Sequence, residues 1–244
     1  MKLRAYAAVV LGLVAALSRP AAAQDIPNLK DFVAWLAMMS TPYGALPPVV
    51  TPAMSAPQPK AGSGSVFELR YGHYAFDGSS DAVHSGGVGA RFGRVGVIVG
   101  YEGCSGCGGD IIGGVDYDAT VVSQMLTGNG ASSYFTVGLR PAFGFGRTTG
   151  SGRGTSLFSG TIDVPFAVAV PVGKTARVVP FVAPGFGIGS ARGGGESDTG
   201  TRGSIAFGAG VVDLSPGLSL NLSWRKIFFE SAPTTIGLGL TLSR

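Results

Sequence analysis

The chain is poor in the residues from which most soluble sites are built. Of its 244 residues, 13% are charged, two are histidines and two are cysteines. Two cysteines without a second pair or a nearby histidine cannot complete a structural zinc site, so we expect no metal and no cofactor. After residue 23, no apolar run reaches the roughly 18 residues that indicate a membrane-spanning helix. Glycine is abundant instead, with 41 residues, and 45% of the chain is hydrophobic.

Residues 1–23 have the three-part pattern of a secretory signal peptide. Lys2 and Arg4 form its charged start, an apolar stretch follows at residues 7–17, and three alanines precede Gln24. The apolar stretch is too short to cross a bilayer, so we expect cleavage before Gln24. Loss of the leader's three basic residues lowers the formal charge from +4 to +1. A mature chain that is nearly neutral predicts no nucleic-acid partner.

From residue 66 onwards, apolar residues alternate with polar residues and glycine at a period of two. In residues 134–146, for example, Phe135 and Val137 take one side while Thr136 and Arg140 take the other. Successive side chains of a strand point to opposite faces, so each strand has an apolar and a polar face. In an exported chain this pattern favours an outer-membrane β-barrel with lipid outside and a polar lumen. Each spanning strand needs only about 9–11 residues, half of them apolar.

Turn-forming residues divide this region into ten strand-like runs. The breaks include Asp77–Ser80, Thr127–Gly130 and Ser215–Gly217. An even number of strands lets both ends of the barrel lie on the periplasmic side. The sequence therefore predicts ten strands, or eight if residues 94–123 mostly belong to an elaborated loop. The runs are 66–76, 82–92, 94–102, 111–123, 133–146, 156–170, 176–190, 203–212, 217–228 and 234–243.

Residues 24–64 differ in pattern from the rest. Six prolines between residues 42 and 59 predict a linker without a core. The part before them predicts a short amphipathic helix that rests on the barrel rim or the membrane surface. The alternative is a plug inserted into the lumen. Pro27 suits the first turn of this helix, and its apolar residues at helical spacing are Leu29, Phe32, Val33, Leu36 and Met39.

Two glycine-rich segments carry a resemblance to a known family. Val179–Gly189 reads Pro-aromatic-x-x-x-Gly-x-Gly, and Ile205–Val211 is followed by the alternating segment Leu218–Arg225. These segments resemble strands of the opacity-protein and outer-membrane-protein-A-like transmembrane barrels. The resemblance covers about residues 66–244 and implies an up-and-down antiparallel barrel that the barrel-assembly machinery inserts. Such barrels usually end on an aromatic residue, whereas this chain ends Leu-Ser-Arg.

The polar face carries nearly balanced charges. Because an arginine facing lipid would cost about 2–4 kcal/mol at the membrane midplane, we expect the charged side chains to point inward. Arginine binds carboxylates bidentately and a small barrel has room only for side chains, so we expect a charge network across a filled lumen. The glycines of the same face leave a small-solute channel as the alternative. The expected network comprises Glu68, Arg70, Arg91, Arg94, Glu102, Asp116, Asp118, Arg140, Asp163, Arg177 and Arg225.

Cys104 and Cys107 lie in the predicted connection between the third and fourth runs. Two cysteines this close in an exported protein favour a disulfide. Covalent haem attachment requires a histidine after the second cysteine, and Gly108 stands there. A redox-active pair is the alternative.

The two histidines, His73 and His84, flank the first hairpin loop at similar distances, which predicts a cross-strand pair. A lipid-A-modifying barrel enzyme would need histidine, serine and a carboxylate together on the outward face, and Ser85 and Asp81 are the candidates. Ser85, however, has the opposite parity to His84 and is expected to point inward. We therefore expect no catalytic residues and no enzymatic activity, with lipid A modification as a third alternative.

The sequence thus predicts a signal peptide at 1–23, a helix and proline-rich linker at 24–64, and a barrel at 65–244 in a bacterial outer membrane. Glycine- and serine-rich stretches at 147–155 and 190–202 predict external loops. The expected role is structural or adhesive. The expected partners are outer-membrane lipids, the barrel-assembly machinery and surface ligands that the loops contact.

Overall fold

The computed structural model describes residues 35–55, 64–75, 82–104, 109–126, 133–148, 155–173, 175–193, 196–229 and 233–243. The expected signal peptide lies outside these ranges. Residues 35–39 are helical, and two further short helices are α3 (Pro42–Ala45) and α4 (Pro52–Ser55). None of the helices within the described ranges is long and apolar enough to span a membrane. The strands are β1 (Ser65–Ala75), β2 (Ala82–Phe92), β3 (Val95–Cys104), β4 (Gly109–Tyr117), β5 (Ala119–Leu126), β6 (Ser133–Thr148), β7 (Ser156–Asp163), β8 (Phe166–Pro171), β9 (Arg177–Gly193), β10 (Glu196–Ser215), β11 (Leu218–Ile227) and β12 (Thr234–Ser243).

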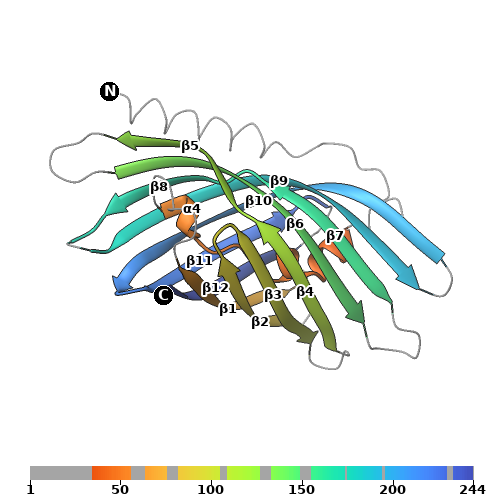
Figure 1. Cartoon of the computed structure of the whole chain (residues 1–244). Helices are drawn as coiled ribbons and strands as arrows, with labels where there is room; N and C mark the ends of the chain where they lie inside the picture. The colour runs from red at the N-terminus through yellow and green to blue at the C-terminus, as the bar shows by residue number, and fades with distance from the viewer. Residues whose placement is uncertain are drawn as a thin grey trace.

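The strands form one closed antiparallel ring (Figure 1). Neighbours along the chain pair in turn, and β12 closes the ring by pairing with β1, with Val66 opposite Ser243. Strands β4 and β5 both pair with β6, and β7 and β8 both lie between β6 and β9. The molecule is therefore a ten-strand barrel with two extra strands, each of which continues the strand before it. The predicted all-β barrel with ten strands is confirmed, and the eight-strand alternative is wrong.

Two of the predicted runs are each divided into two strands. Between β4 and β5, the backbone N–H of Asp118 donates to the carbonyl oxygen of Arg94 at 2.8 Å, and the pairing with β6 shifts register soon afterwards. Between β7 and β8 stands Pro165, which has no N–H to give to a ladder. Its carbonyl oxygen still accepts a hydrogen bond from the N–H of Gly138 at 2.8 Å. Both breaks bend a long strand without opening the ring.

The outer surface of the ring is apolar. Burial alternates along each strand, and on β1 Phe67, Leu69 and Tyr71 are exposed while Glu68 and Arg70 are buried. A continuous apolar surface of this extent is costly in water, whereas a closed ring leaves no strand edge to satisfy in lipid. The exterior is therefore the lipid-facing surface of a membrane barrel. Other exposed apolar side chains are Val97, Tyr101, Phe143, Ile162, Phe186, Leu220 and Leu238.

The two rims of the barrel differ. We call the rim where β1 begins and β12 ends the inner rim, and the opposite one the outer rim. Tight turns at the inner rim contain Gly93 with φ +59° and Gly217 with φ +76°, a backbone region that favours glycine. Short turns and shared barrel ends are typical of the periplasmic side. We therefore assign the inner rim to the periplasm and the outer rim to the cell surface.

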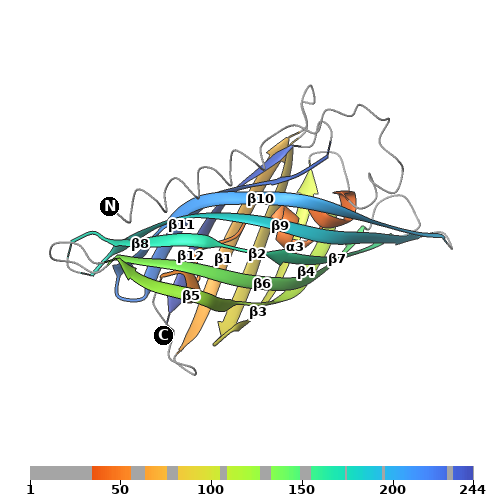
Figure 2. The ribbon, with the colours of Figure 1, turned by 90° about the horizontal axis from the view of Figure 1, so that it is seen from above.

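Strands β9 and β10 form a long hairpin that extends past the end of β11 (Figure 2). Their pairing runs from Val212 opposite Arg177 to Glu196 opposite Gly193, although β11 pairs with β10 only from Ser204 onwards. The external loop expected at residues 190–202 is therefore largely strand. The glycines and serines of residues 190–202 suggested a loop. The pairing between β9 and β10 nevertheless continues through most of these residues, and it satisfies their backbone N–H and C=O groups.

Candidate functional site in the barrel lumen

Residues 35–55, which we name the lumen segment, run inside the ring of strands (Figures 1 and 2). At its start, Trp35 stacks on Phe229 at 5.4 Å between ring centroids and packs with Tyr74 and Ile227, all at the outer rim. At its end, the carbonyl oxygen of Ser55 accepts a hydrogen bond from the Arg177 guanidinium at 3.1 Å, at the inner rim. The segment therefore threads the barrel from one rim to the other.

This placement corrects the favoured expectation for residues 35–55. The predicted short helix is confirmed at residues 35–39, but its placement on the rim or the membrane surface is wrong, because it is buried inside the ring. A linker without a core is also wrong there, and the plug alternative holds. Leu46 and Val49, both 1% exposed, are as buried as any core residue, and Pro42 and Pro52 begin α3 and α4. A segment with apolar residues on every side has no polar face that water could solvate, so the whole segment is buried. Residues 24–34 and 56–63 lie outside the described ranges.

Side chains of the barrel wall satisfy the backbone of the lumen segment. The hydroxyl of Ser85 donates to the carbonyl oxygen of Ala45 at 2.6 Å, and the side-chain oxygen of Asn221 accepts from the N–H of Val50 at 2.9 Å. A buried backbone group without a partner is costly, so each of these contacts anchors the segment. The period-two alternation of a strand predicts that such residues point inward, but it does not reveal which groups they contact. Further contacts are Thr120 to Ala53, Thr136 to Met54, and the 2.8 Å approach of the Ser159 and Thr41 hydroxyls.

Several inward glycines lie where the lumen segment touches the wall. A Cβ atom at Gly237 would lie 2.6 Å from Cδ of Pro47, and one at Gly210 would lie 2.8 Å from Cγ2 of Val50. No real Cβ atom tolerates such distances, so these positions require glycine while the segment stays in place. Beside these two glycines, the lumen segment occupies the space that the sequence left open for a solute.

Near the inner rim, the wall and the lumen segment share an apolar cluster. Met54 and Val50 pack there against inward-facing alanines of β8, β9 and β10 and against Val179 and Phe181 of β9. The small alanine side chains leave room for α4 inside the ring, as a packed core requires. The alanines are Ala167, Ala169, Ala183 and Ala206.

Most of the predicted charged residues meet in buried ion pairs. Glu68 pairs with Arg70, and its other oxygen lies 3.6 Å from Nε of Arg91. Arg91, which is 1% exposed, also pairs with Asp116, so that these four residues form one chain of charges. Tyr43 of the lumen segment reaches the same Asp116 at 3.5 Å. The network therefore includes the segment as well as the wall.

Two further ion pairs lie along the lumen. Arg140 is 3.4 Å from Asp118 and also donates to the hydroxyl of Thr51 at 3.3 Å. Arg225 of β11 pairs with Asp163 of β7, and β9 and β10 lie between these two strands. Because each of these charges is nearly inaccessible to water, its partner is what makes its burial tolerable.

Three predicted members stand apart from these pairs. Glu102 is buried and accepts a hydrogen bond from the Tyr74 hydroxyl at 3.1 Å, and Arg177 binds the lumen segment through Ser55. The inward placement of Arg94 is wrong, because this residue lies in the exposed turn between β2 and β3. Its hydrogen bond to the Tyr117 hydroxyl raises the pKa of the Arg94 guanidinium.

The residues considered for catalysis do not converge. His73 lies opposite His84, with ring centroids 4.9 Å apart, as their similar distances from the hairpin loop predicted. The Tyr71 hydroxyl is 2.6 Å from Nδ1 of His84 on the outward face. Ser85 instead points into the lumen, where its hydroxyl is engaged with Ala45, and Asp81 lies outside the described ranges. Histidine and serine are therefore on opposite sides of the wall.

At the end of β3, Cys104 is disulfide-bonded. The chain has only one other cysteine, Cys107, which lies outside the described ranges. The bonded cysteine marks the outer rim, in the connection that leads to β4.

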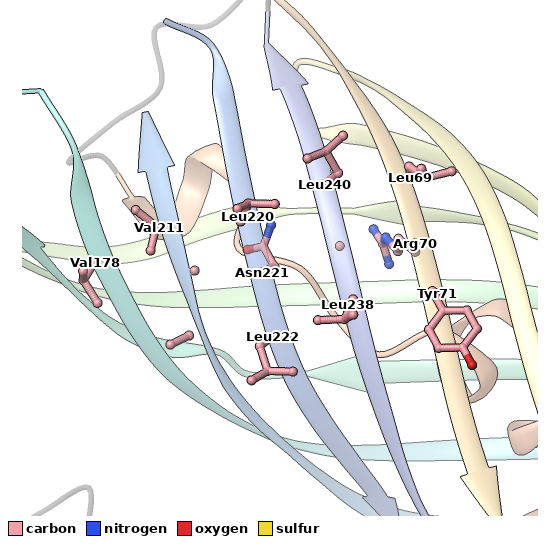
Figure 3. A pocket seen from close by; sticks show the side chains of 13 residues that line it. Leu69, Arg70, Tyr71, Val178, Val211, Leu220, Asn221, Leu222, Leu238 and Leu240 are labelled. Atoms are coloured by element: carbon pink, nitrogen blue, oxygen red, sulfur yellow. The ribbon is translucent and has the colours of Figure 1, made fainter. Parts of the chain in front are cut away.

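A groove of about 420 Å³ lies on the exterior across β9, β10, β11, β12 and β1 (Figure 3). Leu220, Leu222, Leu238 and Leu240 line it, while Arg70 and Asn221 at its floor are 4% exposed and belong to the lumen side. Its lining is mostly apolar, as expected for a lipid-facing wall.

No protein-family model and no curated protein matches the chain. The decisive observation is the closed ring with its apolar exterior. The chain is an outer-membrane β-barrel. Solved structures to which the chain is similar include the β domain of the Bordetella autotransporter BrkA, with 16% identity, TM-score 0.43, and 75% of this chain and 100% of that one covered.

Two further solved structures are similar at a comparable level. The attachment invasion locus protein Ail of Yersinia pestis has 12% identity and TM-score 0.35, covering 75% of this chain and 99% of its own. The outer-membrane enzyme PagL has 13% identity and TM-score 0.36, covering 72% of this chain and 98% of its own.

Proposed function

We propose that this outer-membrane barrel is closed to solutes and acts as a structural or surface-interaction protein through its outer rim. The observation that carries the proposal is the lumen segment, which is buried from Trp35 at one rim to Ser55 at the other. The segment and the buried ion pairs together occupy the space that a pore would need. Function then belongs to the parts that project from the membrane.

Single-channel recording in planar bilayers tests the closed lumen. The full-length protein is expected to give no stable conductance step, because a solute would have to displace hydrogen-bonded chain from a glycine-lined wall. An open porin reconstituted in the same lipid serves as the positive control. A large and stable step from the wild-type protein would refute the proposal and favour the small-solute channel.

The β9–β10 hairpin is the projecting element best suited to surface contact. It extends past the end of β11, and Thr199 and Thr201 are exposed on it. Removing two residues from each strand, Ser190–Ala191 and Asp198–Thr199, shortens the hairpin while keeping its alternation, because these residues face one another. Cells expressing this variant are expected to adhere less to host-cell and abiotic surfaces, with heat-modifiable gel migration unchanged. Adhesion equal to that of the wild type would show that the hairpin does not mediate surface contact.

We further propose that the barrel has no enzymatic activity on lipids. The separation of His84 from the inward-facing Ser85 supports this, since a nucleophile and its base must be within hydrogen-bond reach. Lipid A from cells expressing the wild type, the His84→Ala variant and an empty vector is expected to give identical mass spectra. A modification present only with the wild type would establish the enzyme instead.

A further inference from the structure

Above the lipid-facing band at the outer rim, two arginines lie in one row across adjacent strands. Arg147 of β6 is opposite Ser156 of β7, and Ser156 is opposite Arg192 of β9. Neighbouring strands are about 4.8 Å apart, so the two arginine backbones are separated by roughly 10 Å with a hydroxyl between them. We name Arg147, Ser156 and Arg192 the arginine row.

The arginine row faces the membrane side of the wall. Arg147 follows the exposed Phe145 by two residues, and Ser156 precedes Phe158 by two, so both share the outward face. The Arg192 guanidinium lies 5.9 Å from the centroid of the Phe158 ring, which holds it against the outermost aromatic side chains. The row therefore stands where the hydrocarbon of the membrane ends and the headgroups begin.

The charges of the row are available to a ligand. Both arginine side chains are exposed, and within the described part of the chain no carboxylate forms an ion pair with either. This contrasts with the lumen, where Arg70, Arg91, Arg140 and Arg225 are each paired. Two further hydroxyls of this face, those of Ser190 and Thr199, are hydrogen-bonded to each other at 3.0 Å.

From this arrangement we propose that the arginine row binds the phosphate group of an outer-leaflet glycolipid. Two guanidinium forks with a hydroxyl between them match the oxygens of a phosphate monoester, which arginine binds bidentately. The aromatic side chains below the row would contact the first methylenes of the acyl chains. A phosphate group on a lipid would bind the arginine row while its acyl chains contact the aromatic side chains. A free anion in solution would contact only the arginine row.

Binding of three probes to the folded full-length protein tests the proposal. The probes are bisphosphorylated lipid A, the same lipid A after enzymatic removal of its phosphates, and inorganic phosphate. Phosphorylated lipid A is expected to bind at least about tenfold more tightly than the dephosphorylated form, as the loss of charge-assisted hydrogen bonds requires. Millimolar inorganic phosphate is expected not to compete. Equal binding of the two lipids, or full competition by inorganic phosphate, would overturn the lipid-phosphate assignment.

Matched variants connect this preference to the row. Arg147→Gln/Arg192→Gln is expected to lose the preference for phosphorylated lipid A, and Arg147→Lys/Arg192→Lys to retain only part of it, because lysine keeps the charge without the fork. The control Arg94→Gln/Lys226→Gln removes two exposed positive charges elsewhere and is expected to bind within about twofold of the wild type. Heat-modifiable migration verifies that each variant is folded. A folded glutamine variant that keeps the full preference would refute the proposal, and the lysine variant gives the same test if the glutamine variant does not fold.

Discussion

Arg140 joins the wall of the barrel to the chain that fills it. Its guanidinium is 3.4 Å from Asp118 on the wall and 3.3 Å from the hydroxyl of Thr51 in the lumen segment, and the side chain is 5% exposed. A buried charge that loses its partner has no water to replace it. Single residues of this kind therefore control whether wall and segment remain one unit.

We predict that Arg140→Met destabilises the folded barrel by about 3–5 kcal/mol, because the buried Asp118 carboxylate is left without its partner. Equilibrium urea unfolding in lipid vesicles, followed by tryptophan fluorescence, measures the change. The double variant Arg140→Met/Asp118→Leu is expected to recover much of the loss, since no unpaired charge remains. Arg94→Gln, in an exposed turn, serves as the control and is expected to change stability by less than about 0.5 kcal/mol. Equal effects of the two single variants would contradict the buried pairing.

A second prediction at this scale concerns the wall glycines. In Gly237→Val the new side chain would overlap Pro47, so the lumen segment is expected to shift and to become accessible to protease in the folded, membrane-inserted barrel. Gly86→Val is the control, because a Cβ there meets nothing within 4 Å. Limited proteolysis in vesicles, with amino-terminal sequencing of the fragments, locates the cuts. Protection of residues 35–55 in Gly237→Val would show that the segment does not depend on this contact.

At the scale of elements, the lumen segment has a direction. It begins beside Phe229 at the outer rim and ends beside Arg177 at the inner rim, from which β1 starts. The segment therefore crosses the membrane inside the barrel before the first strand crosses it in the wall. The start of this short segment therefore lies at the cell surface, whereas its end lies at the periplasmic rim.

We predict that a bulky, membrane-impermeant maleimide labels Leu36→Cys on intact cells and does not label Ser55→Cys until the outer membrane is permeabilised. Leu36 is partly exposed at the outer rim, and Ser55 is 6% exposed at the inner rim. The native cysteines contribute no background while they remain disulfide-bonded. Labelling with the opposite preference would mean that the rims are assigned the wrong way round.

For the whole molecule, the apolar exterior makes lipid part of the folded structure. Leu238 lies midway along β12 between Leu222 and Tyr71, whereas Leu242 is one residue from the strand end at the inner rim. The cost of placing a charge on this surface therefore depends on its depth in the membrane.

We expect Leu238→Arg to destabilise the barrel by about 2–4 kcal/mol and Leu242→Arg by about 0–1 kcal/mol. Both variants add the same charge to the same face of the same strand, so each is the control for the other. Urea titrations in vesicles give the two free energies. Indistinguishable losses would contradict the assignment of this face to the lipid.

The period-two alternation was enough to predict the barrel, its ten strands and the side of the wall on which most charged residues lie. Phe135 and Arg140 could be assigned to opposite faces because the direction of a strand side chain is a local property of the backbone. The alternation did not predict the breaks at Asp118 and Pro165, because a bend within a strand depends on the pairing of its neighbours. The tertiary structure alone decided that residues 35–55 fill the lumen, that Gly237 and Gly210 lie against that segment, and which carboxylate each arginine meets. Closing the ring brings together groups far apart in the sequence, and no local pattern records the partners that this closure selects.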